Sequence, residues 1–282
     1  MGYVPALSNA PFSWHHLNEW NLGVIPIILM LCAGLIYFQY ARNVPSWPAV
    51  RTVCFGLGLL VTFLATETFI GYYDMEYFSD HMIQHLMLIM VAAPLFALSA
   101  PLDLAYDAGS ATMRKWLDSK FMERLTHPLV AFALYFFFIP FTHLTGFMNL
   151  MMEHEWLHQL EELGFLVVGY LFFRAAFGLE RGFKLHPGLR LVYVMAAVPV
   201  DTFTGLVLSN SSRVPYSNFA MMAPRGSTAA WRLSDIKLGG GIMWIGGDAL
   251  MLLACVPIAV MWVRWEMIQT KKLDAILDAQ GI

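Results

Sequence analysis

The sequence predicts an all-α integral membrane protein, a bundle of seven transmembrane helices in a single domain spanning 1–282. Hydrophobic residues make up 58% of the 282 residues and charged residues only 13%, about half of the ~25% found in soluble domains. The mean hydropathy is positive. Long charge-free stretches recur along the chain, and a helix needs about 20 mainly apolar residues to cross a bilayer. These observations exclude a soluble globular protein.

Seven charge-poor segments predict the crossings. No basic residue precedes Arg42, so the N-terminus lacks the basic region of a signal peptide and we interpret the first segment as a retained helix. The connection at 102–126 is short and basic, which predicts a surface helix. The longest external connection, 210–239, contains prolines, Ser and Asn, which indicates an irregular loop able to cover a site beneath it. The predicted spans are 22–41, 51–71, 81–101, 127–145, 154–173, 190–209 and 240–263.

The distribution of basic residues predicts the orientation. Short cytoplasmic loops carry an excess of Lys and Arg, and one set of alternate loops holds thirteen of the seventeen basic residues. The opposite set holds four, all within 210–239. The sequence therefore predicts that the N-terminus lies outside and the C-terminus is cytoplasmic.

Charge and cysteine content exclude two further classes. The net charge of −3 provides no broad basic surface, so we expect no nucleic-acid partner. Cys32, Cys54 and Cys255 all lie in apolar segments without a close-spaced pair. This pattern offers neither a disulfide framework nor a CxxC metal site, and we interpret the cysteines as small buried hydrophobic residues.

Two pairs of histidines occur at helical spacing, His81 with His85 at the start of the third predicted span and His154 with His158 at the start of the fifth. Residues i and i+4 lie on one helix face, about 5–6 Å apart at Cβ, so each pair can direct two imidazoles at one point. The predicted topology places both pairs on the outer side. We therefore predict that they form one metal site there. Imidazole suits zinc, copper, iron and nickel alike, so the pairs do not identify the metal.

Acidic residues extend the polar face of the fifth predicted span. Glu161 and Glu162 follow His158 by three and four residues, before a clean apolar run begins. Ionisable groups at membrane depth are costly and usually face a bundle interior or a water-filled cavity, so we expect this face to point inward. Other acidic residues inside predicted spans are Glu67, Asp201 and Asp248.

Three other functions fit parts of this pattern. The segment from His154 to His158 matches the HExxH sequence of zinc hydrolases, with Glu155 as the general base. One histidine from each helix could instead bind haem, as in a membrane b-type cytochrome. Asp201 and Asp248 are compatible with an ion or proton transporter, although no inverted repeat is evident. We interpret the remaining histidines as isolated: His15, His16, His127, His143 and His186.

Longer motifs surround the histidine pairs. The first is His81-Met-Ile-Gln-His85, followed by Ala92-Ala93-Pro94-Leu95 and Ala100-Pro101. The second is Glu153-His154-Glu155-Trp156-Leu157-His158, and the third is Asp235 before Gly239-Gly240-Gly241-Ile242-Met243-Trp244. Together these motifs resemble the polytopic CtaG-type (caa3) cytochrome c oxidase assembly factor family, over residues of about 12 to 265.

This resemblance implies a multi-pass protein of the bacterial plasma (inner) membrane that is needed to mature a haem-copper oxidase. It implies a non-enzymatic role in binding or handling copper for the binuclear centre. The HExxH segment and the cytochrome alternative described above leave zinc and haem as alternative cofactors. The expected partners are oxidase subunits or other copper chaperones. The implied metal ligands are His81, His85, His154 and His158, with Glu67, Glu161 and Asp235 as outer or additional ligands.

Overall fold

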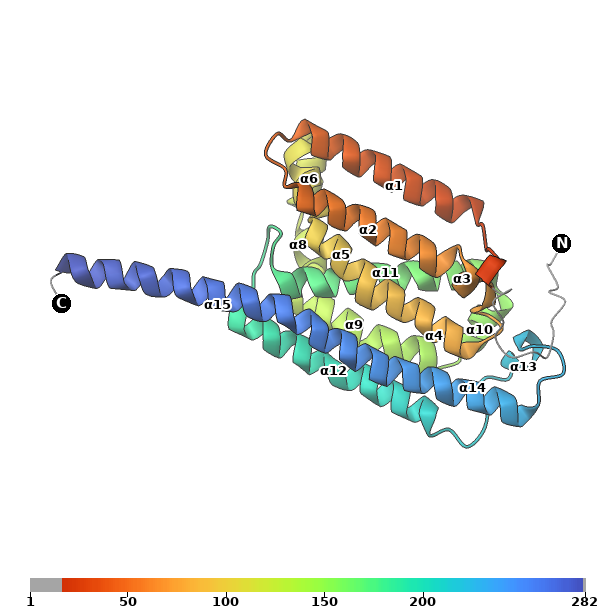
Figure 1. The fold of residues 1–282 in the computed structure, drawn as a ribbon. Helices are drawn as coiled ribbons and strands as arrows, with labels where there is room; N and C mark the ends of the chain where they lie inside the picture. Colours follow the sequence, from red (N-terminus) through yellow and green to blue (C-terminus); the bar gives the residue numbers. More distant parts are fainter. Residues whose placement is uncertain (1–16, 281–282) are drawn as a thin grey trace.

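The computed structural model describes residues 17–280, where helices are joined by short connections and no strand occurs. Figure 1 shows the long helices lying side by side in a bundle, with the C-terminal helix running past it. The first half of the chain forms α1 (Val24–Asn43), α2 (Ala49–Thr66), α3 (Phe69–Tyr73), α4 (Phe78–Leu86), the π-helical η2 (Met87–Ala92), α5 (Ala93–Ser99), α6 (Pro101–Ala108), α7 (Ala111–Leu117) and α8 (Lys120–Leu125). The second half forms α9 (Pro128–Leu144), α10 (Phe147–Glu153), α11 (Glu155–Phe177), α12 (Pro187–Ser209), α13 (Phe219–Met222), α14 (Ala229–Gly241), the π-helical η3 (Ile242–Gly246) and α15 (Gly247–Gln280).

Within the described chain, five helical stretches are long and apolar enough to cross a membrane. The number becomes six if α9 and α10, which are bent by 67° relative to each other, count as one span. The fold is therefore that of an all-helical, multi-pass membrane protein, but the seven predicted crossings are not confirmed. When α9 and α10 count as one span, the only predicted span that is missing among residues 17–280 is 154–173, which corresponds to α11. The first two turns of α11 contain three glutamates and a histidine. α11 nevertheless lies within the bundle, packed against α5 and α9.

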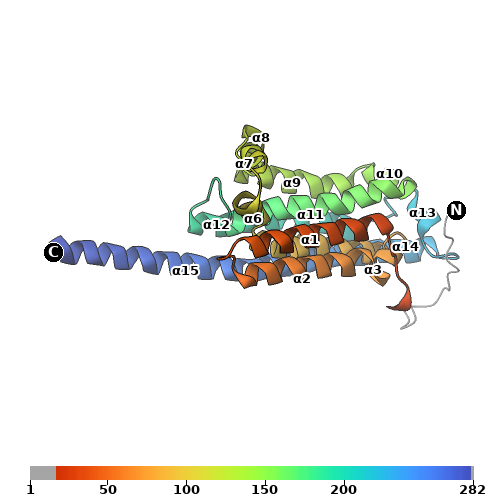
Figure 2. The same cartoon turned by 90° about the horizontal axis from the view of Figure 1, so that it is seen from above.

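The two ends of the bundle carry different elements. α3, α10 and α13 lie at one end, while the short helices α6, α7 and α8 gather at the opposite end, as Figures 1 and 2 show. Ser110 and Ser119 start α7 and α8, each accepting a hydrogen bond from a backbone N–H of the first turn. These two helices contain four of the basic residues from which we predict the cytoplasmic side: Arg114, Lys115, Lys120 and Arg124. Which membrane face each end occupies stays a prediction.

Small residues bring the inner helices close together. A Cβ atom on Gly169 of α11 would lie 2.8 Å from the Cβ of Ala93 and 2.9 Å from the backbone oxygen of Ile89. A Cβ on Gly205 of α12 would lie 2.6 Å from the backbone oxygen of Gly240 on α14. Small residues at membrane helix interfaces allow this backbone approach. The first contact is important for the site, because it fixes α11 against the span that begins with α4.

The span that begins with α4 contains one wide turn. In η2 the N–H of Ala93 donates to the backbone oxygen of Leu88, five residues earlier. The next residue, Pro94, has no N–H to donate, so the regular four-residue pattern cannot continue through it. The π-helical turn begins two residues after His85, at Met87, and separates the start of the span from its second half.

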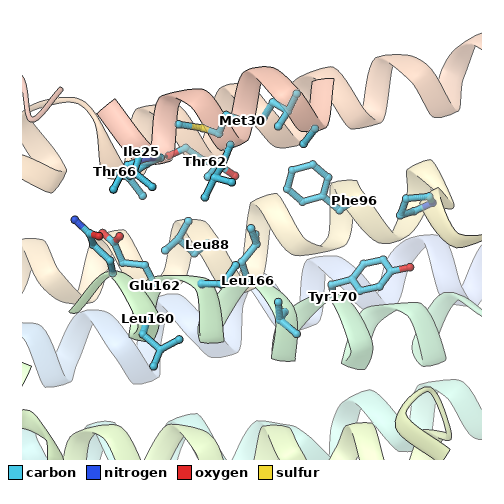
Figure 3. Close-up of a pocket in the computed structure, with 18 of the residues that line it drawn as sticks. Ile25, Met30, Thr62, Thr66, Leu88, Phe96, Leu160, Glu162, Leu166 and Tyr170 are labelled. Atoms are coloured by element: carbon cyan, nitrogen blue, oxygen red, sulfur yellow. The ribbon is translucent and has the colours of Figure 1, made fainter. Parts of the chain in front are cut away.

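α1 lies at the periphery of the bundle. Only 11% of its most apolar window is buried, against 56% for the span Phe78–Ala108. It packs on α2 and α6. Between α1, α2 and α11 lies a pocket of about 790 Å³ with a mainly apolar lining. Figure 3 shows Glu162 at one end of this pocket, on the side of Thr62 and Thr66, with Tyr170 toward the other end.

Candidate metal site

Three histidines converge inside the bundle, toward the end where α3 and α10 lie. His81 and His85 are on α4, and His143 is in the last turn of α9. One ring nitrogen from each lies within 4.8 Å of the others. Their exposed fractions are 0, 3 and 1%. We call these three residues the imidazole group.

The helical spacing on α4 directs two rings at one another. The Nε2 atoms of His81 and His85 lie 2.8 Å apart, so one ring donates a hydrogen bond to the other. Two nitrogen ligands bound to one ion at ~2.0–2.1 Å lie about 2.8–3.4 Å apart for bond angles of roughly 90–109°. The separation in the structure is at the short end of this range. The pair can therefore bind one ion through Nε2 with little movement.

His143 is held in a suitable orientation by its own helix. Its Nδ1 lies 3.0 Å from the backbone oxygen of Ile139 and 2.8 Å from the hydroxyl of Thr142. A histidine that donates one N–H to a backbone carbonyl keeps the other nitrogen free as an acceptor or metal ligand. The Nε2 of His143 is buried and has no hydrogen-bond partner. This nitrogen is therefore available to a metal.

The carboxylate of Glu161 lies beside the imidazole group. One of its carboxylate oxygens lies 3.7 Å from Nε2 of His85, and the other lies 4.0 Å from Nε2 of His81. Both oxygens are buried and accept no hydrogen bond. Burying a polar group without a partner costs roughly 1–3 kcal/mol, and more for a charge. A cation bound beside the histidines would remove this cost.

Aromatic residues and the long external loop seal the imidazole group. The ring of Phe165 stacks on that of His85, with centroids 3.9 Å apart. Tyr216, from the loop between α12 and α14, is 3% exposed and donates a 2.6 Å hydrogen bond to the backbone oxygen of His143. The same loop packs Phe219 against Phe78. Part of the 210–239 segment thus covers the site.

A second group of possible ligands lies beside the first. It consists of Asp74, between α3 and α4, with His158 and Glu162, one turn apart on α11. Their ligand atoms also lie within 4.8 Å of one another, and Nε2 of His158 is 3.3 Å from Oδ2 of Asp74. Burial raises the pKa of Asp74 to about 8, although a hydrogen bond from Gln84 opposes the shift. We call these three residues the carboxylate group.

His154 joins neither group. It is the single extended residue between α10 and α11, with φ −135° and ψ 102°, and its side chain is exposed near Trp156. His158 lies inside α11 and is buried, so the two rings do not share a helix face. The HExxH geometry of a zinc hydrolase, in which both histidines project from one helix, is therefore absent here. Glu155 is exposed as well.

The two other acidic residues that we predict near the metal form hydrogen bonds with protein groups outside the imidazole group. Glu67 is buried and accepts a 2.7 Å hydrogen bond from the backbone N–H of Gly23. Asp235, on α14, accepts hydrogen bonds of 2.7 Å from the backbone N–H of Phe78 and from the hydroxyl of Ser79. It therefore caps the N-terminus of α4. Of the predicted residues, the structure brings together His81, His85 and Glu161, with His158 in the neighbouring group.

The remaining intramembrane acids also have partners. Asp201 accepts a 2.6 Å hydrogen bond from the hydroxyl of Tyr135, and Asp248 accepts one from Thr202. Among the isolated histidines, His127 and His186 each accept a hydrogen bond from a nearby backbone N–H at the start of a helix. His15 and His16 lie outside the described residues.

Sequence reasoning missed His143, Asp74 and the role of Glu162. A single histidine at the end of an apolar helix has no periodic partner, and Asp74 lies outside the predicted spans. The only sequence signal for His143 was its position at the same predicted membrane level as the histidine pairs.

Comparisons with known proteins agree with the motifs. A family model described as cytochrome c oxidase caa3 assembly factor matches residues 31–265. Uncharacterized proteins of Mycobacterium bovis and Mycobacterium tuberculosis are each 26% identical over 283 residues, covering 93% of this chain and 42% of the relative. An uncharacterized protein of Mycobacterium leprae is 26% identical over 262 residues, covering 87% of this chain and 39% of its own length.

The chain thus spans less than half the length of these curated relatives. No solved structure matches it. The family model covers most of the sequence, including both histidine pairs, and it agrees with the resemblance drawn from the motifs. The chain belongs to the cytochrome c oxidase caa3 assembly factor family.

Proposed function

We propose that this protein holds copper for delivery to a haem-copper oxidase, and that the imidazole group with Glu161 is the holding site. The observation that carries the proposal is the convergence of His81, His85 and His143 in one sealed volume. Members of an oxidase assembly family act on the oxidase machinery, and copper is the cargo expected for the binuclear centre of such an oxidase. Copper is the substrate here rather than a resident cofactor.

The donor set supports copper. Imidazole nitrogens bind copper and zinc well, whereas carboxylate and carbonyl oxygens suit harder cations. Three imidazoles also leave room for exchange, because transfer of a metal requires an open or replaceable position, unlike a closed structural site with four protein ligands. Glu161, 3.7 Å from His85, supplies a negative charge beside the ion without adding a close ligand.

The packing disfavours a haem at the same place. The His81 and His85 rings lie 4.0 Å apart, and Phe165 stacks on His85 at 3.9 Å. These rings occupy the volume that a planar macrocycle between two axial histidines would need. The pair on α4 is instead arranged to share one small ion.

We propose that the protein acts in the bacterial plasma membrane. The basic residues predict that the end holding α3 and α10 faces outward, so the imidazole group would lie near the outer surface. We propose that copper arrives from that side and that oxidase subunits or copper chaperones exchange it there. Tyr216, which covers His143, must move aside for this exchange.

Titration with Cu(I) tests the proposal directly. The full chain, purified in lipid nanodiscs, is titrated anaerobically against a coloured Cu(I) chelator. We expect one tightly bound Cu(I) per chain. His143→Ala should weaken binding by more than about 100-fold, because loss of an outer-sphere partner alone already costs 10–100-fold. His154→Ala, a matched control from the motif that stays outside the group, should bind as the wild type does.

Oxidase maturation gives the second readout. Membranes from cells carrying His143→Ala should contain the variant protein but lack copper and activity in the oxidase. Cells carrying His154→Ala should assemble a normal oxidase. Normal oxidase copper in the His143→Ala cells would overturn the proposal.

A further inference from the structure

The carboxylate group stands apart from the imidazole group in chemistry and access. Asp74 and Glu162 supply carboxylate oxygens and His158 supplies one ring nitrogen. The two groups are neighbours, since the rings of His81 and His158 lie 5.6 Å apart. We propose that Asp74, His158 and Glu162, assisted by Gln84, form a second metal site that takes a divalent cation.

The ligand atoms are already gathered. His158 and Glu162 project from the same face of α11 at i and i+4 spacing. Asp74 approaches from the connection between α3 and α4, and its Oδ2 lies 3.3 Å from Nε2 of His158. That nitrogen is buried and makes no hydrogen bond of acceptable geometry. A cation placed among the three would engage it.

Gln84 marks the position of the cation. Its Nε2 lies 2.7 Å from Oδ2 of Asp74, 2.7 Å from Oε1 of Glu162 and 3.3 Å from the backbone oxygen of Ala65. An amide nitrogen carries two hydrogens and cannot donate to three acceptors at once. Its Oε1 is buried and without a partner, on a side chain that is 0% exposed. Rotation of this amide would give a bound cation one more oxygen ligand.

The two carboxylates of the carboxylate group also favour a bound cation. Gln84 donates hydrogen bonds to Asp74 and Glu162, and His158 lies beside Asp74. Among residues 17–280, neither carboxylate forms an ion pair with a Lys or Arg. Two carboxylates held this close repel each other unless a cation or a proton intervenes. A divalent cation balances both charges at once, and carboxylate, amide oxygen and imidazole are ligands that Mn²⁺ and Zn²⁺ accept.

Access separates the two sites as well. The imidazole group is sealed, whereas Glu162 is partly exposed and lines the pocket between α1 and α11. Figure 3 shows its carboxylate at one end of that pocket. Glu162 therefore borders a pocket that His81, His85 and His143 do not line. The inference goes beyond the copper proposal and does not depend on it.

Manganese is the probe that separates the sites, because it favours oxygen ligands over an all-imidazole set. The full chain in nanodiscs is titrated with Mn²⁺, and free Mn²⁺ is followed by its electron paramagnetic resonance signal. We expect one bound Mn²⁺ per chain. Glu162→Gln and His158→Ala should each weaken it at least tenfold. Glu155→Gln and His154→Ala, exposed residues one or two turns earlier, should change it less than twofold.

Reciprocal variants decide whether the sites are distinct. Glu162→Gln should keep Cu(I) binding within about threefold, and His143→Ala should keep Mn²⁺ binding while losing Cu(I). Gln at position 162 retains an oxygen for Gln84, and elution as a single species verifies that each variant is folded. The proposal is overturned if the wild type binds no Mn²⁺ below millimolar concentration, if Glu162→Gln leaves binding unchanged, or if His143→Ala abolishes Mn²⁺ and Cu(I) together. Failure of Cu(I) binding alone would count against the proposed function and not against this site.

Discussion

The Nε2 atoms of His81 and His85 lie 2.8 Å apart, one helical turn from each other on α4. Each ring is buried, and the Nδ1 atom on the opposite side of each ring has no hydrogen-bond partner. Two nitrogens at this separation can bind one ion together, as proposed above, and the predictions below concern the residues that maintain the pair.

Thr142→Val tests the support of His143. The hydroxyl of Thr142 lies 2.8 Å from Nδ1 of His143 and helps to hold the ring with Nε2 toward the group. Loss of such an outer partner typically costs 10–100-fold in metal affinity. We expect a tenfold or greater loss of Cu(I) affinity with unchanged stoichiometry, measured by chelator competition. Thr145→Val, an exposed residue at the end of the same helix, is the control. Equal affinities for both variants would contradict this role.

Asp235→Ala tests the cap of α4. Asp235 accepts hydrogen bonds from the Phe78 N–H and the Ser79 hydroxyl, and without it the first turn of α4 loses both. Loss of an N-terminal cap costs about 0.5–2 kcal/mol. We expect faster amide hydrogen exchange in α4 and weaker Cu(I) binding, because His81 lies in that turn. Asp274→Ala, exposed on α15, should change neither. Unchanged exchange in α4 would show that the cap is dispensable.

Gly169→Ala tests the contact between α11 and the span that begins with α4. The added methyl would lie 2.8 Å from Ala93 and 2.9 Å from the oxygen of Ile89, too close without backbone movement. Overpacking of this kind costs about 1–3 kcal/mol. We expect a lower free energy of unfolding in a denaturing-detergent titration. Gly241→Ala, where a Cβ meets nothing within 4 Å, should be neutral or stabilising. A neutral Gly169→Ala would mean that the helices separate at no cost.

Arg174→Leu tests the buried ion pair at the other end of α11. Its Nε lies 2.7 Å from Oε2 of Glu180, and both side chains are at least 93% buried. Removing one partner of a buried pair costs about 3–5 kcal/mol, because the other charge stays buried alone. We expect a large fall in the midpoint of thermal unfolding. The exposed Arg181, paired with Asp107, provides the comparison, and Arg181→Ala should cost less than about 1 kcal/mol. Similar shifts for both variants would refute this distinction.

The sequence predicted the all-helical membrane fold class and two of the three residues of the imidazole group, His81 and His85. Apolar stretches separated by charged connections suffice to predict membrane helices, and the α4 histidines share a face because i and i+4 positions always do. The same rule failed for His154, because it assumes an unbroken helix and the chain interrupts α10 and α11 at that residue. α11 itself is polar for its first two turns, so counting apolar residues does not reveal whether it crosses.

Other parts of the site depend on how the helices meet. His143 reaches α4 only because α9 ends beside it, and no periodicity along α9 reports that neighbour. Asp235 accepts a hydrogen bond from the backbone N–H of Phe78, which lies 157 positions earlier in the sequence. Such pairings are properties of the packed bundle, and the periodicity of one sequence does not reveal them.

The π-helical turn of η2 separates the rotational orientation of α4 from that of α5. A regular α-helix rotates about 100° per residue, so the direction of every side chain after residue 92 would be fixed by that of His85 if the helix were uniform. The wide turn inserts one residue between them. The face that carries His81 and His85 can thus point to the centre of the bundle while Ala93 and Ala97 keep their own alignment against neighbouring helices. Because of the π-helical turn, the direction of the two histidines does not determine which residues of the second half of the span pack against its neighbours.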